Sequence, residues 1–447
     1  RKTWVQIPSS GILSINHVPK DINMKKDTAS KGLVSFIKDT LLWNLSGSIG
    51  YQVYLCFLIC LMLTGVYGYF IQFQLGLSAT NMSNIVSWGF YISNFTFLVG
   101  VAAAAVMLIL PSYVFNDKDL HKVVIIGEVV AVGALVMCMT FVFVDLGRPL
   151  QFWHLIPGIG QLNFPSSLLS WDILVLNGYL ALNALIPAYI VFCHYQGKEP
   201  VGKYYKPFVF ISIGWAVAIH MVTAFLYQGL PARPFWNNPL MGPRFLASAF
   251  AAGPAIISLV LHVVNSATDY KIDNKIFNKL RIIIVSAAVI NLLMLFSEVF
   301  KEFYFPTHHS QSAMYLFFGL EGHNSLVPWI WTAISINVIG TLILAFNPFK
   351  EKQILLFPAL ILLIVGIWIE KGIGLIVPGL VPSPMGEIIS YSPSNVELFI
   401  TIGVLGLGMF VVTMLLKPAL IIEKRYEDSR EKNPLDSLNK RIIAFEK

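Results

Sequence analysis

Ten long apolar segments dominate this sequence and set its class of fold. Each has about 20 largely apolar residues, enough to cross about 30 Å of lipid hydrocarbon as a helix. Helices suit such segments because hydrocarbon offers no water to unpaired backbone groups. The predicted spans are residues 49–72, 85–110, 122–145, 168–193, 206–230, 244–265, 281–300, 325–346, 354–377 and 395–417. We therefore expect an all-α integral membrane protein.

The composition indicates that lipid, rather than water, surrounds these segments. Of the 447 residues, 56% are hydrophobic and 12% are charged, whereas soluble domains carry about 25% charged residues. The net charge of +7 does not indicate nucleic acid as a partner, because no binding motif accompanies the Lys and Arg residues. The four cysteines lie in apolar runs without a C-x-x-C pair, so we expect any iron–sulfur cluster in a partner subunit.

Positive charge is distributed unevenly between the two sides of the predicted membrane domain. With ten spans, both termini and the even-numbered connections share one side, which holds 26 of the 31 Lys and Arg residues. Cytoplasmic loops carry such an excess. We therefore predict that both termini are cytoplasmic. Residues 1–48 then form an amino-terminal segment, 49–418 the transmembrane domain and 419–447 a carboxyl-terminal tail.

Two short helices are expected besides the spans. Between Lys31 and Leu45, apolar residues recur at helical spacing, namely Leu33, Phe36, Ile37, Leu41 and Leu45. This pattern predicts an amphipathic helix along the membrane surface. A segment that contacts a partner protein is an equally good interpretation. Residues 312–320 favour a second short helix, directly before the eighth span.

An internal repeat relates spans two to five to spans six to nine. The matching groups are Trp171 and Asn177 with Trp331 and Asn337, Gly229, Leu230 and Pro234 with Gly379, Leu380 and Pro384, and Phe97 and Gly100 with Phe250 and Gly253. A shift by four spans preserves the direction of each helix. We therefore expect two parallel four-helix bundles, related by an axis along the membrane normal, with the first and last spans beside them.

The connections after spans three, five, seven and nine are long and rich in Gly, Pro and aromatic residues. They begin near Asp145, Tyr227, Phe303 and Ile376. Long connections of this composition are commonly functional surfaces. On the predicted topology they lie outside the cell, where we expect them to dock a peripheral subunit.

Ionisable residues of the spans concentrate near that external side. Each costs about 2.5–3.5 kcal/mol at mid-span, so its presence needs an explanation. Asp172 and His220 lie at similar depth in the fourth and fifth spans. A carboxylate and an imidazole can accept the protons that a quinol releases with its electrons. The alternative is a set of helix-end charges that pair or reach toward the surface, which suits Asp145, Glu298 and Lys371 better.

Glu128 differs because it lies toward the cytoplasmic face, in the third span. It is a candidate for the start of a proton path, and equally for a hydrogen-bonded acid that locks two helices. His262 and Asn265, near the inner end of the sixth span, are its expected partners. Haem is not expected, because His220 and His262 lie at different depths and axial ligands must match in depth.

Several motifs resemble the NrfD/polysulfide reductase family of membrane subunits. The most specific motif is D-L-G-R-P at 145–149, followed by F-W-H at 152–154 and S-W-D at 170–172. Other similar landmarks are the segment from Trp88 to Asn94, Glu128, A-I-H at 218–220 and P-R-F at 243–245. Ten spans with D-K-D-L-H before the third are most similar to the DsrP and HmeB branch of sulfur metabolism. The quinol-oxidising subunits of alternative complex III look like more distant relatives.

The resemblance implies a cofactor, partners and a location. The cofactor is menaquinone or menaquinol, with no haem or iron–sulfur cluster in this chain. The electron partner is an external ferredoxin-like iron–sulfur subunit. Further redox subunits, such as a cytochrome or a cytochrome b-type membrane subunit, complete the complex. The membrane is the prokaryotic cytoplasmic membrane.

The resemblance also implies site residues, position by position. Asn94, Asp172 and His220 line a quinone pocket in the first bundle, and Arg148 fixes its loop. Arg233 and Arg244 stabilise a semiquinone or contact the partner. Quinol-oxidising relatives can have histidine at the position of Asn94, which leaves the direction of the reaction open. In the second bundle, Glu370 and Thr332 replace His220 and Asp172, so we expect one active pocket.

Together these features predict a subunit of a respiratory menaquinone or menaquinol oxidoreductase. It exchanges electrons with the iron–sulfur partner, and Glu128 is the candidate for proton coupling. Two alternatives stay open. A secondary transporter would have helices broken at mid-bilayer in both repeats. A passive membrane anchor would have no quinone site.

Overall fold

The computed structural model describes residues 32–431 except 157, 269, 306, 308, 309 and 347–352. Within these residues the chain forms helices and no strands, and ten spans are long and apolar enough to cross a membrane. The predicted all-α membrane fold is therefore confirmed. The greater part of the predicted amino-terminal segment, residues 1–31, and the last part of the tail, residues 432–447, lie outside the described residues.

The ten spans agree closely with the predicted ones. They are α2 (Ile49–Leu75), α3 with η3 and α4 (Phe90–Ala102, Ala103–Ala105 and Val106–Tyr113), α6 (Val124–Asp145), α7 (Leu168–Tyr195), α8 (Gly202–Gln228), α9 (Met241–Ala267), α10 (Asn274–Tyr304), α12 (Val327–Phe346), α13 with α14 (Gln353–Lys371 and Ile373–Leu380) and α15 (Asn395–Glu431). The short helices are α1 (Leu33–Leu45), η2 (Gly76–Ala79), α5 (Lys118–His121), η4 (Pro149–Leu155) and α11 (Gln311–Phe317). The last of these is the helix expected before the eighth span.

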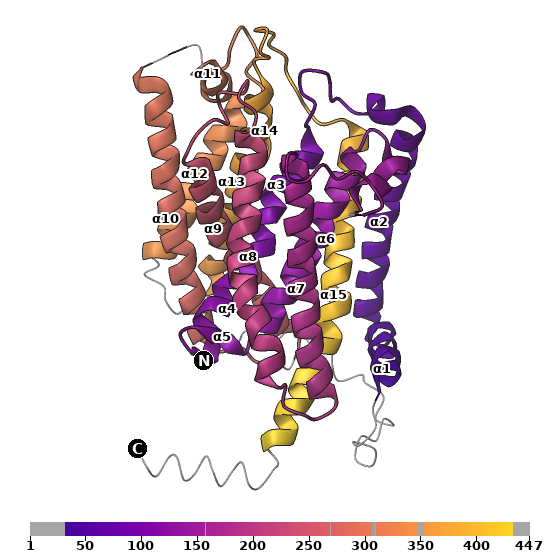
Figure 1. The fold of residues 1–447 in the computed structure, drawn as a ribbon. Helices are drawn as coiled ribbons and strands as arrows, with labels where there is room; N and C mark the ends of the chain where they lie inside the picture. Colours follow the sequence, from indigo (N-terminus) through magenta and orange to yellow (C-terminus); the bar gives the residue numbers. More distant parts are fainter. Residues whose placement is uncertain are drawn as a thin grey trace.

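The spans stand side by side and give the molecule two distinct ends (Figure 1). One end carries α1, α5 and the end of α15, and we call it the basic side because it holds most of the Lys and Arg residues that the structure describes. The other end carries α11 and the long connections, and we call it the loop side. Large apolar side chains such as Leu185 and Phe296, with exposed fractions of 69% and 67%, cover the flanks. Such a surface suits lipid.

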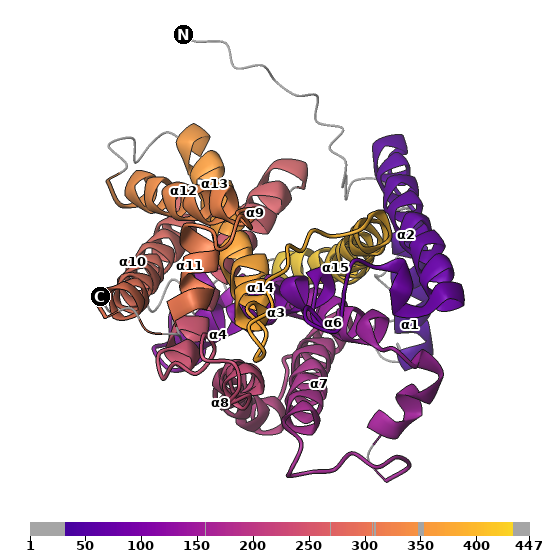
Figure 2. The same ribbon diagram turned by 90° about the horizontal axis from the view of Figure 1, so that it is seen from above.

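Helix packing divides the spans into two bundles with a flanking pair. The first bundle comprises α3, α6, α7 and α8, and the second comprises α9, α10, α12 and α13. Seen from above, the second bundle lies to one side of α3, while α2 lies at the opposite edge with α15 between it and α6 (Figure 2). The predicted arrangement of two four-helix bundles beside the first and last spans is therefore present.

The two bundles meet where small residues let α3 and α9 approach closely. A Cβ atom on Gly253 would lie 2.3 Å from the Cβ of Ala104 and 3.4 Å from the carbonyl oxygen of Gly100. A Cβ on Gly100 would lie 3.4 Å from Ala249. Gly100 and Gly253 are the pair that the sequence repeat matches, so repeat-related residues face each other across the interface between the bundles.

The flanking helices α2 and α15 also pack through glycine. A Cβ on Gly403 would lie 2.3 Å from the Cα of Gly65, which leaves no room for any larger residue. Ser48 caps the start of α2 by accepting a hydrogen bond from the Tyr51 amide. On the loop side, the buried carboxylate of Glu397 in α15 accepts hydrogen bonds from Tyr391 and from the Ser394 amide, which fixes the entry to this helix.

The amphipathic helix predicted before the first span is α1, and it packs on the bundle through Phe36 and Trp43. Phe36 contacts Phe192 and Tyr195 of α7 with edge-to-face rings. Trp43 is buried, with Arg425 of α15 over its ring. The predicted apolar face is otherwise exposed, with Leu33 at 60% and Leu45 at 75%. The position of this face against the membrane surface stays a prediction.

Two spans are interrupted. The second changes from α-helix to 3₁₀ turn at Ala103–Ala105, and the ninth breaks at Gly372. A Cβ on Gly372 would lie 2.6 Å from the Trp368 carbonyl oxygen and 3.1 Å from that of Ser93, so the break lets α13 approach α3. Spans two and nine are not counterparts in the repeat. The interruptions therefore lack the symmetry expected of a transporter built from inverted or parallel repeats.

Candidate functional site

Asp172 is the centre of the candidate site, in the first turns of α7 on the loop side. Its side chain is buried, with 1% exposed. Its Oδ1 atom accepts a hydrogen bond of 2.7 Å from the hydroxyl of Thr223 on α8. Burial of a carboxylate is costly unless hydrogen bonds or a proton compensate it. The Thr223 hydroxyl supplies one such bond and joins two helices of the first bundle at this point.

A cavity of about 360 Å³ lies beside Asp172, between α6, α7 and η4. Its wall is mainly apolar, and Asp172 and Asn177 contribute the polar side chains. The remaining lining residues are Met139, Val142, Phe143, Leu146, Phe152, Leu155, Ile156, Leu169, Ile173, Leu174 and Leu176. Phe152, Ile156 and Leu169 are also exposed on the surface. The cavity therefore connects a buried carboxylate with the flank of the molecule.

His220 lies one helical turn deeper than Thr223 on α8. Its side chain is fully buried, and its Nδ1 bonds to the Ala216 carbonyl oxygen over 2.8 Å. That contact makes Nδ1 the donor, which leaves Nε2 as an acceptor. Nε2 has no hydrogen-bond partner within the described part of the chain. The structure thus brings His220 and Asp172 onto adjoining helices, though His220 does not line the cavity beside Asp172.

Tyr227 is a buried polar residue close to this site that the sequence reasoning did not select. Its hydroxyl and that of Thr96 in α3 are 2.5 Å apart. Its ring packs against Trp88 and Trp236, with centroids 5.8 Å and 5.3 Å away. The spacing of His220, Thr223 and Tyr227 places all three on one face of α8. That spacing was the available signal, because only one helix face points into the bundle.

Arg148 belongs to the connection between α6 and α7, but it does not line the cavity beside Asp172. It is exposed and lines a second cavity of about 390 Å³, which also includes Gln72 of α2 and Gly147. The two cavities share Leu146, so the L-G-R-P segment separates them. Gln72 donates to the Val144 carbonyl oxygen over 2.6 Å and thereby holds the end of α6. Arg148 is near the Asp172 cavity without lining it.

Asn94 faces the second bundle rather than the cavity beside Asp172. Its Nδ2 donates to the Phe90 carbonyl oxygen over 2.7 Å, and its Oδ1 accepts from the Trp368 indole over 2.9 Å. Trp368 belongs to α13, so this amide joins the two bundles. Asn94 is not among the residues that line the Asp172 cavity.

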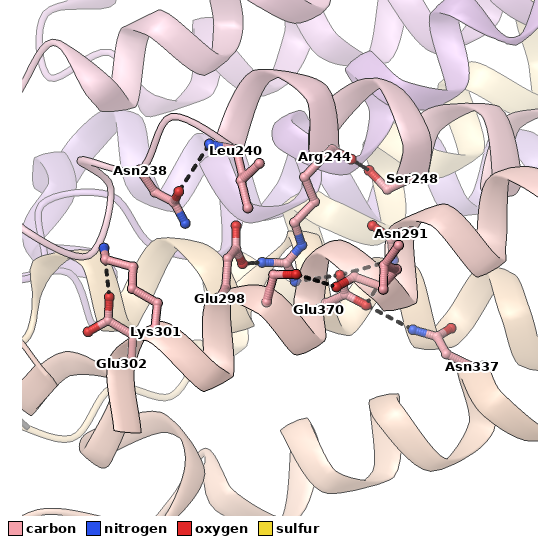
Figure 3. A network of polar contacts seen from close by, with 12 residues as sticks. Asn238, Leu240, Arg244, Ser248, Asn291, Glu298, Lys301, Glu302, Asn337 and Glu370 are labelled. Carbon is pink, nitrogen blue, oxygen red and sulfur yellow. Dashed lines mark hydrogen bonds and ion pairs between the residues drawn. The ribbon is translucent and has the colours of Figure 1, made fainter. Parts of the chain in front are cut away.

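Arg244 is the centre of a polar network in the second bundle (Figure 3). Its guanidinium pairs with Glu298 of α10 and, over 2.7 Å, with Glu370 of α13. Glu370 also accepts hydrogen bonds from Asn291 and Asn337, at 3.3 Å and 3.0 Å. The network, with one buried cation and two carboxylates, thus joins α9, α10, α12 and α13. The two carboxylates more than offset the single positive charge of Arg244.

Lys371 follows Glu370 directly in the sequence, whereas Arg233 belongs to the connection between α8 and α9. The Lys371 amine lies 4.5 Å from the centroid of the Phe245 ring, a cation–π contact. Arg233 lies on the loop side, where its Nη1 donates to the Leu380 carbonyl oxygen over 2.7 Å. That bond ties the connection after α8 to the end of α14. Partial burial lowers the pKa of the Arg233 guanidinium, which still stays protonated.

Glu128 is buried in α6, with 2% exposed, but not with the partners expected for it. Its Oε2 has no hydrogen-bond partner among the residues that the structure describes. His262 packs against the rings of Phe277 and Phe357, and the Asn265 side chain accepts from the Ile272 amide. The expected pairing is therefore wrong. Depth along two helices does not fix the direction in which their side chains point.

The second bundle has a different arrangement at the positions that match the candidate site. Glu370, the counterpart of His220, is held by Arg244 and two asparagines. The cavity beside this network has a volume of about 40 Å³, against about 360 Å³ beside Asp172. The smaller cavity has no room for an aromatic ring system. A single active pocket stays a prediction, which these volumes support.

Residues 78–382 match the family model described as "Polysulphide reductase, NrfD". The matched residues include those of the Asp172 cavity and of both bundles. The chain belongs to the NrfD family. The family predicted from the D-L-G-R-P and S-W-D motifs is thus confirmed. The matched region extends from the end of α2 to the end of α14.

Several curated NrfD-family relatives are similar over most of their length. The C subunit of selenate reductase from Mesobacillus selenatarsenatis is 23% identical over 85% of this chain and 97% of its own. The Hdr-like menaquinol oxidoreductase integral membrane subunit of Archaeoglobus fulgidus is 21% identical over 85% and 96%. The C polypeptide of polysulfide reductase from Wolinella succinogenes is 28% identical over 38% and 56%. These relatives are membrane subunits of oxidoreductase complexes.

Proposed function

We propose that this NrfD-family chain is the quinone-interacting membrane subunit of a respiratory oxidoreductase, and that menaquinone or menaquinol reacts in the cavity beside Asp172. One observation carries the proposal. A buried carboxylate forms part of the wall of a largely apolar cavity of about 360 Å³ that reaches the lipid-facing flank. Binding sites for small molecules have this volume and this combination of apolar lining and few polar groups.

The lining residues fit a naphthoquinone. Apolar and aromatic side chains such as Phe143 and Leu176 suit the rings, while Asp172 offers a group that holds a proton beside a ring oxygen. The cofactor supplies the exchange of two electrons and two protons. The Thr223 hydroxyl orients Asp172 through a hydrogen bond to its Oδ1 atom. His220, with its free Nε2 one turn deeper, is the second proton-accepting group.

Electrons are exchanged with an iron–sulfur subunit on the loop side. The L-G-R-P segment, which separates the two cavities, belongs to this side. The relative from Archaeoglobus fulgidus is named a menaquinol oxidoreductase subunit, and the other two are named as parts of reductases. A short distance from Asp172 to the loop side suits electron transfer to a subunit docked there. Further redox subunits, such as a cytochrome, complete the complex.

The topology follows from the positive charge. The basic side faces the cytoplasm, so both termini are cytoplasmic and the loop side faces outward, in a prokaryotic cytoplasmic membrane. Residues 49–418 then form the membrane domain, although α15 continues past residue 418 to Glu431. Arg148 shapes the loop between the two cavities, and Arg233 lies where it can contact the partner. Asn94 and Arg244 act through the packing of the bundles.

The test uses the complex purified with its partner subunits. Asp172→Asn should reduce quinol-dependent electron transfer by about 100-fold or more, because general acid–base groups contribute about 10²–10⁴-fold. Asp119→Asn is the matched control. The Asp119 carboxylate lies on the basic side. In the Asp119→Asn variant, Lys279 keeps its bonds to Asp117. Equal activity of both variants would refute the assignment of Asp172.

Binding distinguishes a reactive subunit from a passive anchor. A fluorescent naphthoquinone analogue should bind the wild-type complex, and Met139→Trp should abolish its binding by filling the cavity. Absence of binding to the wild-type complex would instead indicate an anchor without a quinone site. Orientation is tested separately by labelling cysteines introduced at Ser83 and Lys198, which lie at opposite ends of the spans. Labelling of Lys198→Cys from the outside would overturn the topology.

A further inference from the structure

Unsatisfied polar atoms gather in the interior of the first bundle. Buried polar atoms are nearly always hydrogen-bonded, so each exception needs an explanation. Four side chains of α6, α7 and α8 have such an atom and are at most 2% exposed. They are Glu128 Oε2, Asn183 Oδ1, Tyr179 Oη and His220 Nε2, each without a hydrogen-bond partner in the described residues. The proposed reaction at Asp172 uses only the last of them.

Three polar residues of α7 lie on the helix face that also forms part of the wall of the Asp172 cavity. Asp172, Leu176, Tyr179 and Asn183 are spaced by four, three and four residues, which places them in one row along the helix. Asp172 and Leu176 line the cavity. The row continues inward from it, because all four residues are buried. Asn183 Nδ2 donates to the Tyr179 carbonyl oxygen over 2.9 Å, which leaves its Oδ1 available.

Glu128 lies on the facing side of α6. It shares a helix face with Leu135, Met139 and Val142, at spacings of seven, four and three residues. Met139 and Val142 line the Asp172 cavity together with residues of α7. The same face of α6 is therefore turned toward α7 along the length of the bundle. Glu128 points into the space between these two antiparallel helices.

The depths of these groups follow from helix geometry. Glu128 lies 17 residues before the end of α6, and Asn183 lies 15 residues after the start of the next span, α7. At about 1.5 Å per residue, the two are at nearly the same level. Tyr179 lies about one turn closer to the loop side. On α8, His220 lies about one further turn outward, since Thr223 beside it bonds to Asp172.

The result is a ladder of polar groups with steps of about one helical turn, or about 5.4 Å. Two hydrogen bonds through one water span about the same distance. Waters in protein interiors bind otherwise unsatisfied polar groups in this way. Glu128 begins the ladder within two turns of the basic side, and Asp172 ends it at the cavity.

We propose that Glu128, Asn183, Tyr179 and His220 hold a file of internal waters that conducts protons between the basic side and the Asp172 cavity. The inference rests on the proposed function, which supplies a proton-exchanging site at one end. In each transfer a proton enters the file at one end as another leaves at the other, so no net bond is made or broken. Asn183 and Tyr179 are positioning residues, because they orient the waters rather than touch the cofactor.

Radiolytic footprinting tests for the waters without any measure of turnover. Hydroxyl radicals formed from an internal water modify the side chain beside it, even when that side chain is sealed from bulk solvent. Tyr179 should therefore be modified in the intact complex. Tyr315 of α11 is the control, since it is 1% exposed and its hydroxyl is satisfied by the Ile389 carbonyl oxygen. Equal protection of both tyrosines would overturn the proposal.

Substitutions at Tyr179 and Asn183 test whether the internal waters conduct protons. In liposomes that contain the complex, Tyr179→Phe and Asn183→Leu should lower proton-coupled turnover at least about tenfold and increase its solvent isotope effect. Binding of the naphthoquinone analogue should not change. Tyr315→Phe removes a hydroxyl elsewhere and should leave all three measurements unchanged. Wild-type turnover and isotope effect in both bundle variants would refute the water file.

The two proposals fail in different ways. If the wild-type complex binds no naphthoquinone analogue, or if Asp172→Asn has full activity, the proposed function fails. If both of these tests succeed while Tyr179→Phe and Asn183→Leu behave as the wild type, only the water file fails. Thermal unfolding of each variant in detergent identifies loss of fold, and footprinting of the wild-type complex tests the waters independently of any variant.

Discussion

The hydroxyl of Thr223 on α8 donates a hydrogen bond of 2.7 Å to the carboxylate of Asp172 on α7. Both side chains are at most 1% exposed, so water does not compete for this bond. The bond fixes the orientation of a carboxylate in the wall of the cavity. It also connects the helix that lines the cavity with the helix that carries His220. The quinone proposal and the water file both depend on this connection.

Replacement of Thr223 tests the importance of that orientation. Thr223→Val keeps the shape of the side chain but removes the donor, whereas Thr223→Ser keeps the hydroxyl. A hydrogen bond to a charged group contributes about 1.5–3 kcal/mol, so we expect turnover of the Val variant to fall by roughly 10-fold to 100-fold. The Ser variant should stay within a few-fold of the wild type. Steady-state quinol oxidation measures both, and equal rates for Val and Ser would contradict the role.

The network around Arg244 predicts that the stability losses of substitutions at Arg244 and Glu370 are not additive. Arg244→Met leaves the carboxylates of Glu298 and Glu370 without their cation. Loss of one partner of a buried ion pair costs about 3–5 kcal/mol. The double variant Arg244→Met, Glu370→Met also removes the more deeply buried of these two carboxylates, so it should unfold at a higher temperature than Arg244→Met alone. Additive losses in thermal unfolding would show that the pair is not coupled.

The sequence predicted the spans and the family because apolar length and the D-L-G-R-P and S-W-D motifs are local features. Asp172 was found in the same way, from its depth near the start of a span. Asn94 and Glu128 were harder. The amide of Asn94 bonds to Trp368 on a helix more than 270 residues away in sequence, and no local pattern indicates that contact.

The structure adds the rotation of each helix about its axis. Periodicity shows that His220, Thr223 and Tyr227 share a face, but not that Thr223 points to α7 while Tyr227 points to Thr96 of α3. Depth alone suggested His262 and Asn265 as partners of Glu128. Helix rotation places Glu128 toward α7 instead, as the shared face with Met139 and Val142 indicates.

Close packing of α2 on α15 predicts a strong steric effect at Gly403. A valine there would place its Cβ 2.3 Å from the Cα of Gly65, so the two backbones must separate. Overpacking of this kind costs about 1–3 kcal/mol or more. Gly214→Val in α8 is the matched control, because a Cβ on Gly214 meets nothing within 4 Å. Gly403→Val should lower the unfolding temperature in detergent, and an equal effect of both variants would contradict the predicted packing.

A pH-dependent contact joins α5 to α10 on the basic side. The Lys279 amine bonds to both oxygens of Asp117, at 2.8 Å and 2.7 Å, and to Asp119 at 2.9 Å. The hydrogen bond from Lys279 lowers the pKa of the Asp117 carboxyl below its ordinary value of 3.8. Because the pKa is lower in the folded state, the contact stabilises the fold fully above about pH 4. This stabilisation is lost as the pH falls through the lowered folded-state pKa.

Thermal unfolding of the wild type and of Lys279→Met between pH 7 and pH 3 measures this contribution. At pH 6–7 the wild type should unfold at a slightly higher temperature, since partly exposed ion pairs contribute about 1 kcal/mol or less. The difference should shrink below about pH 4, because Asp117 takes up a proton in the unfolded chain at a higher pH than in the folded protein. The Asp119→Asn variant should still unfold at a higher temperature than Lys279→Met at pH 6–7, by most of the wild-type difference, because its Lys279 still bonds to Asp117. A difference that grows on acidification would contradict the direction assigned to the pKa of Asp117.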